Sequence, residues 1–283
     1  SNGPVVYYPD ASAPGGNGLT EKWTLDNFGH DPFAKNAMID TAENASARLG
    51  VTMAELNEVT LARFAQYQAA LADDRAFQRR YMVEAPLFDS GFRRQTGTLA
   101  ADEGIFPTTA EGLAKLKPVK PNGTHTFGTQ THPADGNAGM IVTTRELARA
   151  LSADSAIEVE LLGFGQARVD KGFMPLAPAP AAQVALQQAG LSIKDVDAVK
   201  SHNPFAANDI AFARDTGFPL EKMNNYGCSL IWGHPQGPTG LRSTIELIEE
   251  LVLRGGGVGL FTGCAAGDSG MALVLRVREA ARK

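Results

Sequence analysis

The sequence has 283 residues, of which 43% are hydrophobic and 20% are charged, which suits one large or two ordinary globular domains with a substantial core. Its 31 acidic and 26 basic residues give a formal net charge of -5, and no run of like charges is long enough to form a patch. Such a distribution offers no patch for nucleic acid or for a membrane surface. We therefore expect small-molecule chemistry or protein partners, and neither nucleic acid nor a membrane as a partner.

The cysteine count and the first residues bear on compartment and completeness. Two cysteines, Cys228 and Cys264, are too few for a disulfide framework, and the sequence shows no signal peptide and no apolar run of about 18 residues. We therefore expect a reducing, cytoplasmic location. The chain opens on Ser1 without an initiator methionine, so we expect a trimmed chain or a part of a longer one.

The N-terminal region is predicted to be a loop followed by helices. Residues 1–20 are rich in glycine, proline and asparagine, which indicates an extended loop. Asp31 and the proline after it can begin a helix that ends at Gly50. The capping box T-x-x-E at residues 52–55 predicts a second helix, whose apolar residues recur at roughly helical spacing. The rest of the region, to about residue 122, is expected to be helical or irregular.

From Gly123 onward, short apolar runs alternate with segments of helical length. The runs predict strands at 139–143, 157–164, 196–199, 258–261 and 271–277. The segments between them predict helices at 145–151, 179–189, 206–215 and 241–253. This alternation is typical of a layered α/β sheet flanked by helices.

Three side chains capable of acid/base chemistry lie at the ends of these predicted elements. His234 stands in a glycine- and proline-rich turn, G-H-P, just before a helix. Cys264 follows one strand, in C-A-A-G-D-S-G, and His202 follows another, in S-H-N-P-F. Element termini are the usual place for chemistry in α/β folds, so we expect these three residues to form the site.

Several longer motifs resemble the thiolase family. Two of them are N-Y-G-C-S-L-I-W-G-H-P-Q-G-P-T-G and G-L-F-T-G-C-A-A-G-D-S-G-M-A-L-V, and the others are T-A-E-N, P-T-T-A-E-G-L-A-K-L-K-P-V and G-T-H-T-F-G-T-Q-T-H-P-A-D-G. In the order named they occupy residues 225–240, 259–274, 41–44, 107–119 and 123–136. The motifs follow the family's order and together cover nearly the whole chain, which makes chance an unsatisfactory explanation.

This resemblance implies a thiolase-like layered α/β/α domain with a mostly helical loop domain. Residues 1–122 would be the loop domain, 123–153 the tail of the N-terminal α/β domain, and 154–283 the C-terminal domain. The segment that carries the family's nucleophilic cysteine would precede residue 1. We therefore expect a second polypeptide, or another segment, to supply it and to pair with the strand at 139–143, within a homo- or hetero-oligomer such as a dimer or tetramer.

The resemblance also implies catalytic roles. In the family, the nucleophilic cysteine attacks the acyl-thioester, the histidine of G-H-P activates it, and a later cysteine moves the proton of the second substrate. By motif position, His234 takes the base role and Cys264 the acid/base role. His202 stands where the family usually has an asparagine that holds an oxyanion-hole water, so water positioning and direct donation both remain open. Cys228 lies in the segment that leads to G-H-P and does not replace the nucleophile.

Four further residues are expected to contact substrate on the same grounds. Thr131 and His132 fall in the segment that resembles the family's pantetheine-contacting loop, although a solvated loop position is the alternative. Asn203 and Phe205 lie beside His202. No metal-ligand spacing and no phosphate-binding loop occur, so we expect no cofactor. The resemblance implies a coenzyme A thioester as substrate.

The sequence therefore predicts a component of a thiolase-type acyl-CoA C-acyltransferase, which forms or cleaves a carbon–carbon bond next to a thioester carbonyl. One alternative is a ketosynthase-type condensing enzyme of the same fold that uses His202 and His234 together. Another is a catalytically silent scaffold subunit. Retention of both His234 and Cys264 speaks against the scaffold.

Overall fold

A mixed four-stranded sheet with the strand order β5-β8-β7-β6 forms the centre of the protein. The computed structural model describes residues 5–16 and 18–279. The strands are β5 (Ile157–Arg168), β6 (Ala198–His202), β7 (Gly256–Ala265) and β8 (Ser269–Glu279). β8 pairs antiparallel with β5 and with β7, whereas β6 runs parallel to β7.

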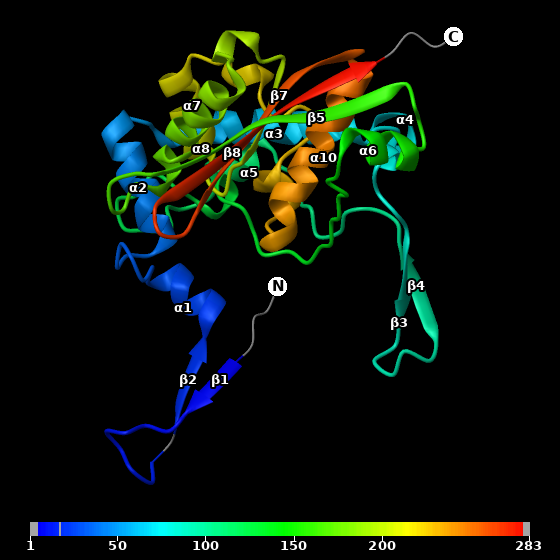
Figure 1. Ribbon diagram of the computed structural model, residues 1–283. Helices are drawn as coiled ribbons and strands as arrows, with labels where there is room; N and C mark the ends of the chain where they lie inside the picture. The colour runs from blue at the N-terminus through cyan, green and yellow to red at the C-terminus, as the bar shows by residue number, and fades with distance from the viewer. Residues whose placement is uncertain (1–4, 17, 280–283) are drawn as a thin grey trace.

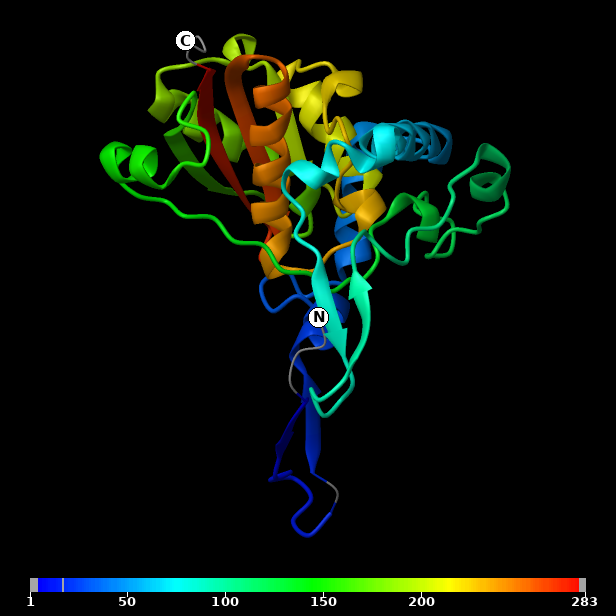
Figure 2. The ribbon, with the colours of Figure 1, turned by 90° about the vertical axis from the view of Figure 1, so that its right-hand side faces the viewer.

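Helices cover both faces of this sheet (Figures 1 and 2). α7 (Pro178–Ala189) and α8 (Ala206–Thr216) pack on one face, in a core that includes Leu260 of β7. α10 (Gly237–Leu253) packs on the other, in a core that includes the next residue, Phe261. Adjacent strand residues point to opposite faces of a sheet, so the continuous apolar run of β7 serves both cores. The predicted layered α/β/α architecture is confirmed.

The predicted second helix is confirmed, and the first is confirmed at its end only. α3 (Met53–Ala70) begins with the expected capping box, in which the Glu55 N–H donates to Thr52 Oγ1 at 3.3 Å. α2 (Met38–Leu49) ends at Gly50, whose φ of 62° is left-handed. The predicted start at Asp31 is wrong. The Asp31 carboxylate instead accepts hydrogen bonds from two following N–H groups, which form a turn, and a third from the N–H of Gly267.

Two predicted stretches of non-strand structure are wrong. In the predicted loop, of which residues 1–4 and 17 lie outside the described residues, β1 (Val5–Tyr8) pairs with β2 (Leu19–Lys22) as a hairpin. The helical region contains a second hairpin of β3 (Ala85–Phe88) and β4 (Gln95–Leu99). Figure 2 shows both hairpins projecting from the same side of the body. Their side chains are largely exposed, so the strands pair through backbone hydrogen bonds. Such pairing leaves no hydrophobic pattern in the sequence from which it could be predicted.

The predicted strand at 139–143 is also wrong. The segment forms no ladder, and Ile141 and Val142 are 77% and 68% exposed. A strand exists through its pairing, and none of the described strands pairs with this segment. The predicted helix that follows is present as α6 (Arg145–Leu151). The domain boundaries at residues 122 and 153 stay predictions.

Short helices complete the fold. They are α1 (Trp23–Gly29), α4 (Ala72–Arg75), α5 (Ala110–Ala114), α9 (Ser229–Trp232) and the 3₁₀ helices η1 (Gln78–Arg80), η2 (Phe127–Thr129), η3 (Met174–Leu176), η4 (Ile193–Asp195) and η5 (Leu220–Lys222). Among the described residues, no helix combines the length and the apolar character that a bilayer crossing requires.

Glycines let α7 approach the sheet at backbone distance. A Cβ added at Gly165 of β5 would overlap the carbonyl oxygen of Ala181, and one added at Gly163 would overlap that of Ala185. The helix contributes small residues to this contact, since Ala181 and Ala185 are both fully buried. Helix and strand therefore meet without intervening side chains, and a single methyl group is enough to separate them.

We expect Gly165→Ala to lower the free energy of unfolding by about 1–3 kcal/mol, because the added methyl group must push backbone atoms of α7 away. Gly139→Ala is the matched control, since nothing lies within 4 Å of its added Cβ, and it should change stability by less than about 0.5 kcal/mol. Urea denaturation of both variants measures the difference. Equal transition midpoints would show that α7 yields without cost.

Candidate active site

The carboxyl ends of β6 and β7 open into a cavity of about 1040 Å³. Because these two strands are parallel, their carboxyl ends meet at one edge of the sheet. His202 is the last residue of β6 and pairs in register with Gly263, so Cys264 lies one residue further along the neighbouring strand. Both side chains line the cavity, together with His234.

His234 is held between a loop and a helix. Its N–H donates to the carbonyl oxygen of His132 at 2.8 Å, and its Nδ1 lies 2.8 Å from Oγ1 of Thr239 in α10. The glycine before it, Gly233, has a φ of 93°, which favours glycine strongly. Burial lowers the pKa of His234 to about 4. The imidazole is therefore neutral near pH 7 and can accept a proton.

The His202 ring stacks on that of His234, with centroids 4.2 Å apart and planes 26° from parallel. Its Nδ1 lies 2.8 Å from Oγ of Ser229. Burial, and then the neighbouring His234, hold the pKa of His202 well below its usual range. A positive charge on either ring would be poorly solvated and would oppose a charge on the other, so the pair is neutral.

Cys264 is 8% exposed, and its Sγ accepts a hydrogen bond from Nδ2 of Asn208 at 3.3 Å. Burial raises the pKa of this thiol to about 12, against a smaller opposite effect of the Asn208 contact. Near pH 7 the sulfur therefore carries its proton and can donate it to a basic carbon or oxygen in the cavity.

Cys228 is placed differently. It is fully buried in an apolar cluster with Trp232 and Ile210 and does not line the cavity. Burial, and then the charge of Asp209, raise the pKa of the Cys228 thiol to about 11. A thiol so placed is a poor nucleophile.

The structure brings three of the four expected substrate contacts to the cavity. Thr131, His132 and Phe205 line it, although Oγ1 of Thr131 already donates to the carbonyl of Ser229 at 2.5 Å. Burial lowers the pKa of His132. Asn203 does not reach the cavity: it is fully buried, and its amide contacts other protein groups. The expectation that Asn203 contacts substrate is replaced by the internal role described below.

Sequence reasoning missed the residues that hold the three acid/base groups. Ser229, Thr239 and Asn208 each contact one of them through a hydroxyl or an amide. Such residues are common at helix starts, where they cap the backbone, so their types alone gave no signal. Met38 of α2 and Met174 add apolar lining from segments distant in the sequence. Within residues 5–16 and 18–279, no group of three or more His, Cys, Asp or Glu side chains is placed to hold a metal ion.

Comparison with known proteins identifies the family. Residues 12–146 match the family model described as the thiolase N-terminal domain, and residues 156–277 match the thiolase C-terminal domain. The chain belongs to the thiolase family. This agrees with the resemblance carried by the G-H-P and C-A-A-G-D-S-G motifs.

Relatives within the thiolase family are named as 3-ketoacyl-CoA thiolases or as acetyl-CoA acetyltransferases. The chain is 35% identical to rat peroxisomal 3-ketoacyl-CoA thiolase B over 76% of its own length and 51% of that protein. It is 34% identical to the acetyl-CoA acetyltransferase of Syntrophomonas wolfei over 87% of its length and 61% of that protein. The chain thus spans about half the length of the first relative and about three fifths of the second.

The fold is shared with solved thiolases. Human mitochondrial 3-ketoacyl-CoA thiolase in complex with CoA superimposes with a TM-score of 0.82 at 25% sequence identity, over 96% of this chain and 67% of that one. The agreement extends over almost every element described above. The mixed sheet and its flanking helices are therefore those of the thiolase fold.

Acid should destabilise the folded chain through its buried histidines. Burial lowers the pKa of His234 from an ordinary 6.5 to about 4, and it also lowers those of His125, His132 and His202. The unfolded chain then binds more protons than the folded chain below pH 6.5. The free energy of unfolding is therefore highest above that pH, where these imidazoles are neutral in both states, and it falls as the pH falls toward 4.

We expect the free energy of unfolding to fall between pH 6.5 and 4, with each such histidine adding a slope of up to about 1.4 kcal/mol per pH unit. The His234→Gln variant should show a shallower slope than the wild-type protein, because it lacks this buried imidazole. Urea denaturation across this pH range measures both slopes. An unaltered slope in His234→Gln would show that His234 titrates normally.

Proposed function

We propose that this chain is the acid/base-bearing component of a thiolase-type acyl-CoA C-acyltransferase, which forms or cleaves a carbon–carbon bond next to a thioester carbonyl. The observation that carries the proposal is the meeting of His202, His234 and Cys264 at one cavity. Membership of a family whose named relatives are 3-ketoacyl-CoA thiolases and acetyl-CoA acetyltransferases supports it.

The protonation states suit a division of labour. His234, neutral near pH 7, takes the proton from a cysteine nucleophile as that sulfur attacks the thioester carbonyl. Cys264, which holds its proton at the same pH, donates it to the carbanion released when the carbon–carbon bond breaks. In condensation the proton moves the other way, from the α-carbon of the second thioester to the Cys264 thiolate, which is the form that proton donation in cleavage leaves behind.

We infer that the substrate is an acyl-CoA thioester, with coenzyme A as the second reactant in cleavage. The cavity is large enough for an acyl-pantetheine end, and Phe205, Met174 and Met271 give it an apolar lining. A solved relative is described as a complex with CoA. The proposed chemistry uses proton transfer and thioester exchange, so we propose no metal or redox cofactor.

We propose that the nucleophilic cysteine comes from a second polypeptide or from another segment. Neither Cys228 nor Cys264 is suited to attack, because burial raises the pKa of both thiols. The exposed Ile141 and Val142 offer an apolar stretch against which such a partner would pack. The working enzyme would then be a homo- or hetero-oligomer, and a cytoplasmic location stays a prediction, since some relatives are named as peroxisomal.

The stacked histidines favour one alternative within catalysis. Two neutral imidazoles beside a thioester site would also serve a ketosynthase-type condensing enzyme, which uses a histidine pair with a cysteine nucleophile. Product analysis separates the two activities. A thiolase cleaves 3-ketoacyl-CoA with free CoA, whereas the alternative would require a malonyl-thioester and release carbon dioxide.

We expect native mass spectrometry of the purified protein to show this chain bound to a second polypeptide. Denaturing mass analysis should then place on that polypeptide a cysteine that iodoacetamide alkylates with loss of thiolysis, because neither cysteine of this chain forms a thiolate readily. A folded, self-associated assembly of this chain alone, without activity, would favour a silent scaffold.

We expect His234→Gln and Cys264→Ser each to lower the kcat for thiolysis of a 3-ketoacyl-CoA by about 10²–10⁴-fold in the purified assembly, as for the loss of a general acid or base. The exposed His30→Gln variant should keep wild-type kcat. Steady-state kinetics measure the effect, and native mass spectrometry confirms that assembly survives. Unchanged kcat in both site variants would show that His234 and Cys264 take no part in catalysis.

A further inference from the structure

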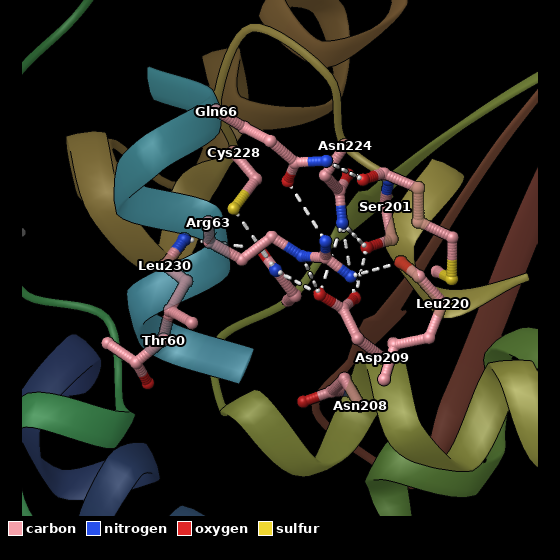
Figure 3. A network of polar contacts seen from close by, with 12 residues as sticks. Thr60, Arg63, Gln66, Ser201, Asn208, Asp209, Leu220, Asn224, Cys228 and Leu230 are labelled. Carbon is pink, nitrogen blue, oxygen red and sulfur yellow. Dashed lines mark hydrogen bonds and ion pairs between the residues drawn. The ribbon is translucent and has the colours of Figure 1, made fainter. Parts of the chain in front are cut away.

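A buried ion pair joins helix α3 to helix α8 (Figure 3). Nε of Arg63 lies 2.8 Å from Oδ2 of Asp209, and the two side chains are 1% and 0% exposed. The Asp209 carboxylate accepts further hydrogen bonds, among them one from Oγ of Ser201 at 2.7 Å. Nη2 of Arg63 donates to the carbonyl of Leu220 at 3.0 Å. Burying two charges is costly unless their hydrogen bonds are satisfied, as most of these are.

The ion pair fixes the orientation of Asn203. Its Nδ2 donates to Oδ2 of Asp209 at 2.8 Å, and an ionised carboxylate only accepts hydrogen bonds, so this end of the amide is the nitrogen. Oδ1 then faces the opposite way and accepts from the N–H of Leu230 at 3.1 Å. Both ends of the Asn203 amide are therefore determined by groups whose roles cannot reverse.

The hydroxyl of Ser229 stands between Asn203 and His202 with three polar neighbours. The backbone N–H of Asn203 donates to Ser229 Oγ at 3.1 Å. The side-chain Oδ1 of Asn203 lies 3.1 Å from the same oxygen, and Nδ1 of His202 lies 2.8 Å from it. A hydroxyl has one hydrogen and two lone pairs. Since Asn203 Oδ1 only accepts, all three contacts are hydrogen bonds in one arrangement: Ser229 donates to Oδ1, and His202 Nδ1–H donates to Ser229.

We propose that Asn203 and Ser229, anchored by the Arg63–Asp209 ion pair, are positioning residues that hold His202 as the tautomer with hydrogen on Nδ1. Because Nδ1 faces Ser229, Nε2 is the ring nitrogen left for the cavity, and it carries a lone pair. His202 therefore meets a substrate, or a water beside it, as a hydrogen-bond acceptor. It does not donate directly to a thioester oxyanion.

The tautomer follows from contacts within the chain, whereas its use on a thioester rests on the proposed function. The two can be tested separately, because the proton position on His202 is measurable without substrate or turnover. Oγ of Ser201 supplies a control, since it donates to Oδ1 of the same Asp209 carboxylate but lies outside the path to His202.

Two-bond ¹⁵N–¹H correlation spectra of the ¹⁵N-histidine-labelled protein test the proposal, with His202→Asn used to assign the His202 signals. We expect a protonated, pyrrole-type Nδ1 and an unprotonated, pyridine-type Nε2. Asn203→Ala frees the Ser229 hydroxyl to donate to His202, so the major species should become the form with hydrogen on Nε2. Ser201→Ala should retain the wild-type pattern.

Arg63 is tested in the same spectra. Arg63→Met removes the cation beside Asp209 and should increase the population of the Nε2–H form, whereas Arg63→Lys should restore the wild-type pattern. A wild-type spectrum with hydrogen on Nε2, or an unchanged tautomer in Asn203→Ala, would overturn the proposal. Absence of thiolysis with the expected tautomer would instead count against the proposed function and leave the positioning network standing.

Discussion

The parallel pairing of β6 with β7 is the contact on which the candidate site depends. It places His202 opposite Gly263 and so brings Cys264 to the same edge of the sheet, although Gly263 stands 61 positions after His202 in the sequence. An antiparallel neighbour would have put the two residues at opposite ends of the sheet. α7 and α10 then hold this sheet from both faces, and the first turn of α10 delivers Thr239 to His234.

Burial decides what the three acid/base groups can do. The same desolvation lowers the pKa of His234 and raises that of Cys264, because it disfavours the charged form of each group. Near pH 7 the site therefore holds neutral imidazoles, each with one ring nitrogen free to accept a proton, and a thiol that keeps its proton. A nucleophilic thiolate would need a different environment, with a cation or hydrogen-bond donors beside the sulfur.

The helical region contributes more to the site than a covering layer. α2 brings Met38 to the cavity wall, and α3 brings Arg63 to the carboxylate that orients Asn203. The loop that carries His132 is tied to the main chain of His234. Apolar contact from α2 and hydrogen bonds from α3 and from the His132 loop thus surround the edge of the sheet at which the two imidazoles stack.

The sequence by itself determined the family, the alternation of strands and helices from β5 to β8, and the identity of His202, His234 and Cys264, because these rest on local patterns and on ordered motifs. It did not predict the two hairpins, whose pairing leaves no burial pattern, and it predicted a strand at 139–143, a segment that pairs with none of the described strands. Only the tertiary structure placed Asn203 inside the protein and Ser229 against His202, because those positions depend on which buried groups meet across the fold. Hydrogen-bond partners distant in sequence carry no local signal.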